Sequence, residues 1–464
     1  MCRKQKSRQL DLFMGEGGAL YHEQVAEHTV REHVSGAGEK PNLLEKILDR
    51  QNLNKAFKQV RKKKGACGID DMDIVSAGEY LAENKEQFLK EALEGKYRPQ
   101  PVKRVEIPKP SGGKRNLGIP TVIDRMMQQA VNQVLTPIFE KRFSENSYGF
   151  RAGRSAHQAI LKARDYYKAG YRWVIDLDLS KYFDTINHEI LLNMVREEVK
   201  DKRVIELIKR FLKSGVMVNG VFERTEEGSP QGGNLSPLLS NIYLTKFDKE
   251  LERRGHHFVR YADDINIYVK SKQAAERVMS SCIKYLEGKL KLKVNRDKSQ
   301  TGSPLKLKFL GFKLWESKDG KQIEPTVHEE SLKRAKERIR ELTPRHMGKK
   351  VSEILEKLAE FTTGWLGYYG IGECQIVVER LDTWIRRRIR AILLYEIRKP
   401  KAMRRRLKEL GADVQDTSAV AYSSRGIWFK SHIKPVQKAY TNKYLETLGF
   451  KSMLKTYELI HSRH

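Results

Sequence analysis

The feature that most constrains this chain is an Asp-Asp pair set between two strand-like runs. In FVRYADDINIYVK, residues 258–270, aromatic and β-branched residues flank Asp263 and Asp264 on both sides. Such residues favour β-strands, and a short break between two runs predicts a tight hairpin. Aspartate is a common turn residue, so a turn alone is one interpretation. A metal site is the other, because two adjacent like charges repel unless a cation lies beside them.

A second strand-like segment also carries acidic residues. In YRWVIDLDLSKYFDTINH, residues 171–188, alternation from Trp173 to Leu179 places Asp176 and Asp178 on one face. These acids either face solvent or serve a site. If the strand lies beside the hairpin, three carboxylates converge, and a divalent cation would relieve their repulsion. Mg²⁺ prefers a few carboxylates together with phosphate oxygens and water, and two such ions can support nucleotidyl transfer.

The charge balance points to a polyanionic partner. The 464 residues carry a formal net charge of +30, which favours nucleic acid first and an anionic membrane surface second. No apolar run is long enough to span a bilayer, and the first residues lack a signal-peptide pattern. The four cysteines are widely spaced without a zinc-binding pair, which fits a reducing compartment. We therefore expect a cytoplasmic protein with no membrane partner.

The order of elements along the chain predicts an α+β protein. Residues 1–40 are polar and without periodicity, and we expect a flexible leader. Helical patterns follow from residue 42, and a Ser-Gly-Gly tip between alternating runs predicts a hairpin near residues 102–120. Strand and helix patterns alternate over residues 172–314. Beyond residue 325 the chain is helical and basic, with one apolar stripe on residues 351–365.

At this point the chain resembles a known family. The YADD segment is similar to the Y-x-D-D motif of reverse transcriptases, and from residue 42 onward the chain resembles bacterial group II intron reverse transcriptases, or maturases. The segments that carry the resemblance occur in the family's order: RVEIPKPSGGKRNLGIP, SYGFRAGRSAHQA, DLDLSKYFDTINH, GSPQGGNLSPLLSNIYL, FVRYADD, LKVNRDKS and KFLGF.

The resemblance implies a right-hand polymerase fold of fingers, palm and thumb, with a helical basic thumb and a small C-terminal region. The domains it implies are a leader (1–40), fingers with an N-terminal extension (41–170), palm (171–322), thumb or maturase X domain (323–400) and a DNA-binding-like region (401–464). Family members often carry a C-terminal endonuclease with cysteine pairs. This chain lacks such pairs, so we expect no endonuclease domain.

The function implied is that of an RNA-directed DNA polymerase encoded by a group II intron. Such a protein also binds its intron RNA to promote splicing and intron mobility. The partners implied are intron RNA, an RNA template with a DNA primer, target DNA and deoxynucleoside triphosphates, with two Mg²⁺ ions as cofactors and the bacterial cytoplasm as location.

The resemblance assigns the catalytic metal site to Asp178, Asp263 and Asp264, with Leu179 beside them. Asp176 stays open as an alternative, because it shares the strand face of Asp178. Phe183 lies where the family places an aromatic side chain against the ribose 2′-hydroxyl, which would select deoxynucleotides. Without the motif, Phe183 would be read as an ordinary core aromatic residue.

Other family positions would contact the incoming nucleotide. Lys109 and Arg115 match the basic pair that clamps the triphosphate, Arg as a fork and Lys as a point charge. Gln231 would lie near the nucleotide, in a loop whose glycines permit close backbone approach. Lys298 would bind phosphate or protonate the departing pyrophosphate.

Two further groups would contact nucleic acid. Leu310 and Gly311, in KFLGF, resemble the primer grip between palm and thumb. Arg386, Arg387 and Arg390 are expected on the outward face of an apolar-striped helix, where they would bind a nucleic-acid backbone. Solvated arginines on a packed helix are the plainer interpretation.

Two other functions remain open. The chain could be a free-standing reverse transcriptase that serves defence or diversification, or an RNA-binding splicing cofactor without polymerase activity. The intact set of aspartates argues against the cofactor, and the long basic helical region favours an intron-encoded enzyme.

Overall fold

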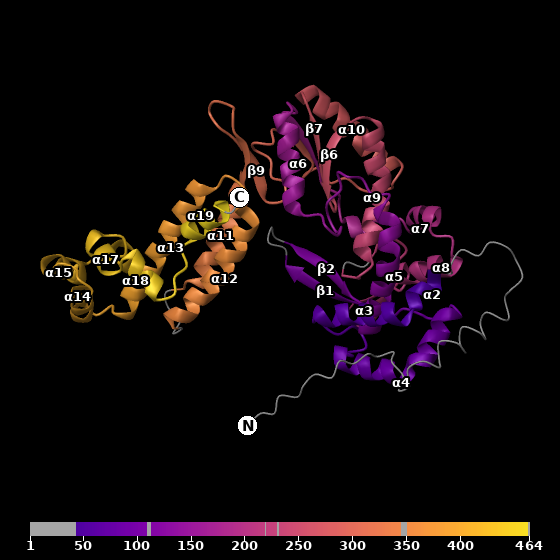
Figure 1. Ribbon diagram of the computed structural model, residues 1–464, viewed down its shortest axis with the longest axis horizontal. Helices are drawn as coiled ribbons and strands as arrows, with labels where there is room; N and C mark the ends of the chain where they lie inside the picture. Colours follow the sequence, from indigo (N-terminus) through magenta and orange to yellow (C-terminus); the bar gives the residue numbers. More distant parts are fainter. Residues whose placement is uncertain (1–42, 109–112, 219, 230–231, 345–349, 463–464) are drawn as a thin grey trace, which may run out of the picture. The chain divides into compact units, whose positions relative to one another are not determined.

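The computed structural model describes residues 43–108, 113–218, 220–229, 232–344 and 350–462 (Figure 1). The expected flexible leader, residues 1–40, lies outside the described residues. Contacts divide the chain into two compact units: residues 1–155 with 175–301, and residues 156–174 with 302–464. Residues 156–170, expected in the fingers, group with the second unit, and so do residues 171–174 and 302–322, expected in the palm. The five domains expected from the sequence are a finer division and remain a prediction.

The first unit contains a four-stranded sheet in the order β2-β1-β4-β5. Its strands are β1 (Val102–Pro108), β2 (Lys114–Ile119), β4 (Val216–Val218) and β5 (Val221–Glu223). β1 and β2 pair antiparallel, with Ile107 opposite Arg115, which confirms the hairpin predicted from the alternating pattern.

A second sheet of this unit has the order β6-β7-β3-β8. Its strands are β3 (Trp173–Leu177), β6 (His257–Tyr261), β7 (Asp264–Val269) and β8 (Gln300–Gly302). β6 and β7 form the predicted hairpin, with Tyr261 opposite Asp264, and β7 lies between β6 and β3. β3 ends two residues earlier than the expected strand, and Leu179 instead forms an isolated bridge with Val294.

The helices of the first unit surround these sheets. They are α2 (Leu43–Leu48), α3 (Arg50–Lys62), α4 (Ile74–Leu93), α5 (Val122–Glu140), α7 (His188–Glu198), α8 (Lys202–Leu212), α9 (Ser236–Arg253) and α10 (Lys272–Gly288), with a short 3₁₀ turn η1 (Tyr182–Asp184). Six of them begin at a side-chain cap that accepts a backbone N–H: Asp49, Asp73, Thr121, Asn187, Asp201 and Ser271. Each such cap stabilises a helix by about 1 kcal/mol. α10 runs along β7, so the hairpin rests on a helical layer (Figure 1).

The second unit is mostly helical. It contains α6 (Ala156–Lys168), the antiparallel pair β9 (Phe312–Glu316) and β10 (Ile323–Val327), and the helices α11 (Glu329–Leu342), α12 (Val351–Tyr369), α13 (Gln375–Glu396), α14 (Pro400–Glu409), α15 (Val414–Tyr422), α16 (Ile427–Lys430), α17 (Lys434–Ala439), α18 (Asn442–Thr447) and α19 (Met453–His461). The expected apolar stripe of α12 is confirmed, because Leu355, Leu358 and Trp365 are buried in one core with Val378 and Ile385 of α13.

Candidate active site

The aspartate pair lies at the tip of the β6–β7 hairpin. β6 ends at Tyr261 and β7 begins at Asp264, so Ala262 and Asp263 form a two-residue loop. Ala262 has φ +58°, the sign that tight two-residue hairpins require at their first loop position. A residue other than glycine in this region costs on the order of 1 kcal/mol or more, so the surrounding structure must hold the loop.

A buried ion pair holds this loop from behind. Arg260 and Asp248 of α9 are both fully buried and joined by two short contacts, Nη2 to Oδ2 at 2.6 Å and Nε to Oδ1 at 2.8 Å. The Nη1 group of Arg260 donates to the carbonyl oxygen of Ala262 and to Oδ1 of Asn241, each at 2.9 Å. One guanidinium therefore joins helix α9 to the loop that presents Asp263.

The SYGF segment, residues 147–150, packs directly on the same loop. The backbone N–H of Tyr148 donates to the carbonyl of Arg260 at 2.8 Å, and Nδ2 of Asn241 donates to the carbonyl of Gly149 at 2.9 Å. A Cβ added to Gly149 would lie 2.2 Å from the backbone nitrogen of Ala262. Only glycine permits this approach, which gives the motif its physical reason.

Sequence reasoning missed the supporting role of Arg260, Asp248 and Asn241. A signal was present, because Arg260 directly follows the apolar residues Phe258 and Val259 in the same strand, and both of these are fully buried. A charged residue on such a strand needs a buried partner. The sequence does not say that the partner comes from α9.

The first predicted aspartates lie on the neighbouring strand. Nδ2 of Asn266 in β7 donates to Oδ1 of Asp176 in β3 at 2.9 Å. Asp178 follows β3, where its N–H donates to Oγ of Ser299 at 3.0 Å. Asp178 lies two residues after Asp176, and Asp264 lies two residues before Asn266, which is about 7 Å of extended chain in each case. Asp176 is thus engaged within the sheet, which supports the preference for Asp178 as the metal ligand.

The donor set suits a hard divalent cation. Asp178, Asp263 and Asp264 offer only carboxylate oxygens, the ligands that Mg²⁺ prefers. Within the described ranges, no three His, Cys, Asp or Glu side chains already lie placed to hold a metal ion together. Convergence of these three carboxylates on a metal therefore remains a prediction.

Phe183 lies in η1, directly after the strand that leads to Asp178. Its ring is half-buried and meets Tyr182 edge to face, with 5.2 Å between ring centroids. Tyr182 is anchored, since its hydroxyl donates to the carbonyl of Ser240 at 2.9 Å, and burial raises the pKa of that hydroxyl. Phe183 is therefore a partly exposed ring on an anchored turn rather than a fully buried core residue.

The other nucleotide-binding candidates are only partly covered. Lys109 and Gln231 lie outside the described residues. The backbone of Arg115 lies in β2, and Lys298 is exposed to solvent. Their expected roles at the triphosphate remain predictions.

The expected primer grip is a tight turn in the second unit. Leu310 and Gly311 both have positive φ, at +50° and +85°, between the bridged residues Phe309 and Phe312. The carbonyl of Leu310 accepts a hydrogen bond from the Tyr368 hydroxyl at 2.8 Å, which joins the turn to α12. The role of the Leu310–Gly311 turn at a primer remains a prediction.

The expectation that Arg386, Arg387 and Arg390 all face outward is wrong for Arg390. Arg390 is only 8% exposed, and its guanidinium donates to the carbonyl of Tyr440 at 2.9 Å and to Oδ1 of Asn442 at 3.1 Å. Burial lowers the pKa of Arg390 to about 10. The C-terminal helices cover this part of α13, which the spacing of residues in α13 does not reveal.

The other two arginines are half-buried and already make contacts within the second unit. Arg386 forms an ion pair with buried Asp382 at 2.9 Å. Arg387 lies over the ring of Trp428, at 4.0 Å from its centroid, a cation–π contact. Their expected contact with nucleic acid remains a prediction.

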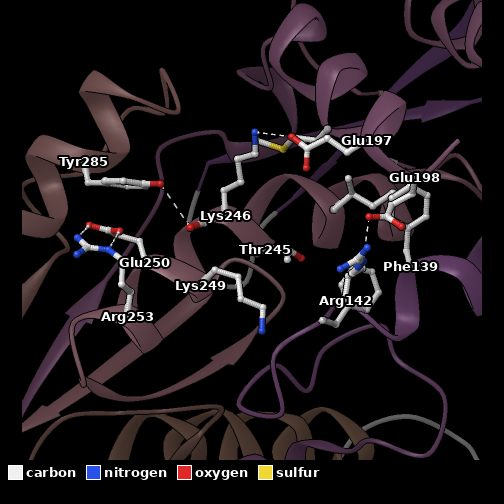
Figure 2. Close-up of a pocket in the computed structure, with 13 residues that line it drawn as sticks. Phe139, Arg142, Glu197, Glu198, Thr245, Lys246, Lys249, Glu250, Arg253 and Tyr285 are labelled. Carbon is white, nitrogen blue, oxygen red and sulfur yellow. Dashed lines mark hydrogen bonds and ion pairs between the residues drawn. The ribbon is translucent and has the colours of Figure 1, made fainter. Parts of the chain in front are cut away.

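A separate pocket of about 420 Å³ lies elsewhere in the first unit, and Figure 2 shows its lining side chains. None of them is a predicted site residue. Each of its four basic side chains has an ion-pair partner: Arg142 with Glu198 (2.9 Å), Lys246 with Glu197 (2.9 Å), Lys249 with Glu252 (2.8 Å) and Arg253 with Glu250 (2.8 Å). This pocket is distinct from the aspartate hairpin, and we assign it no function.

Comparison with known families defines the class of protein first. The family "Reverse transcriptase (RNA-dependent DNA polymerase)" matches residues 107–314, which include the hairpin and β3. The family "Group II intron, maturase-specific domain" matches residues 332–411, which begin in α11 and end after α14. One chain thus carries a polymerase domain followed by a maturase domain.

Individual relatives are similar to this chain over about half of its length. Protein YkfC of Escherichia coli is 37% identical over 298 residues, covering 56% of this chain and 78% of YkfC. Group II intron-encoded protein LtrA of Lactococcus lactis is 35% identical over 241 residues, covering 52% of this chain and 40% of LtrA. The chain belongs to the group II intron reverse transcriptase family.

Among solved structures, a partial Cas6-RT-Cas1–Cas2 complex is 27% identical and covers 56% of this chain and 46% of that chain. Its TM-score is 0.35, and no structural conclusion follows from it.

These matches confirm several sequence predictions. They confirm the family, the α+β polymerase fold with a helical C-terminal region, and the enzyme class of RNA-directed DNA polymerase. The family uses divalent metal ions, and its substrates are nucleic acids, with intron RNA implied by the maturase domain.

Within the described part of the chain, no helix is both long and apolar enough to cross a membrane.

Proposed function

We propose that this chain copies RNA into DNA at a site formed by Asp178, Asp263 and Asp264, and that it binds its own intron RNA to promote splicing and mobility. The observation that carries the proposal is the Asp263–Asp264 hairpin, which Arg260 holds beside β3 inside the polymerase domain. A turn that served only to reverse the chain would not need a fully buried ion pair behind it, because such a pair is costly to desolvate.

The three carboxylates and the backbone of Leu179 would hold two Mg²⁺ ions. Those ions, when bound, would activate the primer 3′-hydroxyl and stabilise the departing pyrophosphate. The protein's own task is to orient the reactants. Asp178 does so from the position just after β3, Asp263 from the hairpin loop that Arg260 holds, and Asp264 from the first residue of β7.

Other side chains would bind and select the nucleotide. Lys109 and Arg115 would bind the triphosphate, and Gln231 would contact the incoming deoxynucleotide. Phe183 would exclude a ribose 2′-hydroxyl, and Lys298 would bind the pyrophosphate or protonate it.

The nucleic-acid partners would be an RNA template with a DNA primer, target DNA and folded intron RNA. The net charge of +30 supports this, because basic residues release counterions from nucleic-acid backbones on binding. Leu310 and Gly311 would contact the primer, and Arg386 and Arg387 an RNA or DNA backbone. We place the protein in the bacterial cytoplasm.

RNA-templated primer extension with deoxynucleotides and Mg²⁺ tests the proposal. Asp264→Ala should lower extension by roughly 100-fold or more, as for other groups that stabilise transition-state charge. Asp416→Ala, an exposed aspartate of α15, is the matched control and should extend normally. RNA binding should be the same in all three proteins.

Two outcomes would contradict the proposal. Normal extension by Asp264→Ala would remove the metal-site assignment. Absence of extension by folded, RNA-binding wild type would instead favour a splicing cofactor without polymerase activity. The maturase domain favours an intron-encoded enzyme over a free-standing reverse transcriptase.

A further inference from the structure

A small backbone ladder joins the Phe183 turn to the loop that precedes α9. Asn187 and Glu227 form an antiparallel bridge. The N–H of Gly228 donates to the carbonyl of Ile186 at 2.8 Å, and the N–H of Ser229 donates to the carbonyl of Phe183 at 2.7 Å. The position of the Phe183 backbone is therefore set by residues 227–229.

There is no free space between these two segments. Gly228 has φ +91°, and a Cβ added to it would lie 2.9 Å from the carbonyl oxygen of Phe183 and 3.0 Å from Cα of Asp184. The far end of the loop is fixed as well, because Oγ of Ser229 donates to Oγ of Ser236 at the start of α9, at 2.9 Å. Any displacement of Gly228 would therefore displace Phe183.

His188 is a further residue that holds Gly228 in place, through its carbonyl oxygen. It is the first residue of α7 and only 3% exposed, and its Nε2 lies 2.6 Å from the carbonyl oxygen of Gly228. Because a carbonyl can only accept, Nε2 carries the proton and donates. Burial lowers the pKa of His188, which favours this neutral form of the ring.

A purely structural role does not explain why this residue is a histidine. The other ring nitrogen, Nδ1, is buried without a hydrogen-bond partner among the described atoms. An unsatisfied buried polar group destabilises a protein, and an apolar side chain of similar size would avoid that loss. What the histidine contributes is the donor to Gly228.

We propose that His188 is a positioning residue for sugar selection, which acts by fixing Gly228 and, through the backbone ladder, Phe183. The inference rests on the proposed function, in which Phe183 lies against the ribose of the incoming nucleotide. His188 itself touches no substrate.

The test is the ratio of kcat/KM for a deoxynucleotide to that for the matching ribonucleotide. Removing the donor in His188→Leu should lower this ratio roughly three- to tenfold, as expected for one lost hydrogen bond. His188→Gln retains an N–H donor and should keep most of the selectivity. Gly228→Ala should lower the ratio by a second route, because its methyl group would displace the Phe183 turn.

Two comparison variants separate this effect from simple destabilisation. Leu191→Ala removes a fully buried core side chain from the same helix and should lower the melting temperature without changing the sugar ratio. Phe183→Ala should lower the ratio most. If His188→Leu does not fold, the other two variants still test the inference. His188→Gln should retain most of the selectivity for deoxynucleotides, and Gly228→Ala should lose part of it.

The outcomes are distinguishable. An unchanged ratio in folded His188→Leu or Gly228→Ala, with a lowered ratio in Phe183→Ala, overturns this inference alone. A lowered ratio in Leu191→Ala also overturns it, because stability would then explain the effect. An unchanged ratio in Phe183→Ala, or no extension by wild type, overturns the proposed function and this inference with it.

Discussion

The buried pair of Arg260 and Asp248 gives the sharpest test of how the active-site loop is held. Asp248→Asn leaves the Arg260 guanidinium charged, fully buried and without its counter-ion. Breaking a buried ion pair in this way costs about 3–5 kcal/mol. Since a typical domain is stable by only about 5–15 kcal/mol, we expect a large loss of stability in the first unit.

A double variant separates stability from positioning. Asp248→Leu with Arg260→Met removes both charges and replaces them with apolar side chains, a change that is often neutral or stabilising. Its free energy of unfolding should recover most of what Asp248→Asn loses, because no buried charge is left without a partner; the remaining deficit comes from the acceptors of Ala262 and Asn241. Its kcat for primer extension should nevertheless stay at least about tenfold low, because Ala262 and Asn241 have lost their donor and the left-handed loop is no longer held.

The assay must report on the correct unit. Four of the five tryptophans, at residues 315, 365, 384 and 428, lie in the second unit, whereas Trp173 begins β3 of the active-site sheet. Tryptophan fluorescence during urea unfolding therefore reports mainly the second unit, and most of its change should be the same in the variants and wild type. Amide exchange at Ile265 and Ile267 in β7 reports the first unit directly. Full polymerase activity in the stable double variant would refute a positioning role for Arg260.

Two further predictions concern groups outside the active site. Burial raises the pKa of Asp124, which accepts hydrogen bonds from Tyr97 and Thr121, to about 6. The folded state then binds this proton more tightly than the unfolded state. The contribution of Asp124 to the free energy of unfolding is therefore greatest below about pH 4, and it is lost as the pH rises through about 6. The stability of wild type relative to Asp124→Asn should fall by on the order of 3 kcal/mol between pH 4 and 7, and a constant difference would refute this. Arg390→Met should lower the stability of the second unit by about 1.5–3 kcal/mol in fluorescence-monitored unfolding, because the Arg390 guanidinium donates hydrogen bonds to Tyr440 and Asn442. Exposed Arg404→Met is the control, and equal stability of the two variants would contradict the buried role.

The sequence by itself determined the local elements of the site. Alternating runs around Asp263 and Asp264 predicted the β6–β7 hairpin, and a Ser-Gly-Gly tip predicted the β1–β2 hairpin. Both follow from interactions between residues close in sequence, namely strand propensity and turn geometry. The order of the motifs then identified the family.

Only the tertiary structure decided what lies against those elements. Asp248 is 12 residues from its partner Arg260, and Asn266 is 90 residues from Asp176. The inward position of Arg390 depends on helices that follow it by about 50 residues. Periodicity tells which residues share a face of a strand or helix, but not which segment covers that face. Such contacts are fixed by packing between distant segments, and no local pattern records them.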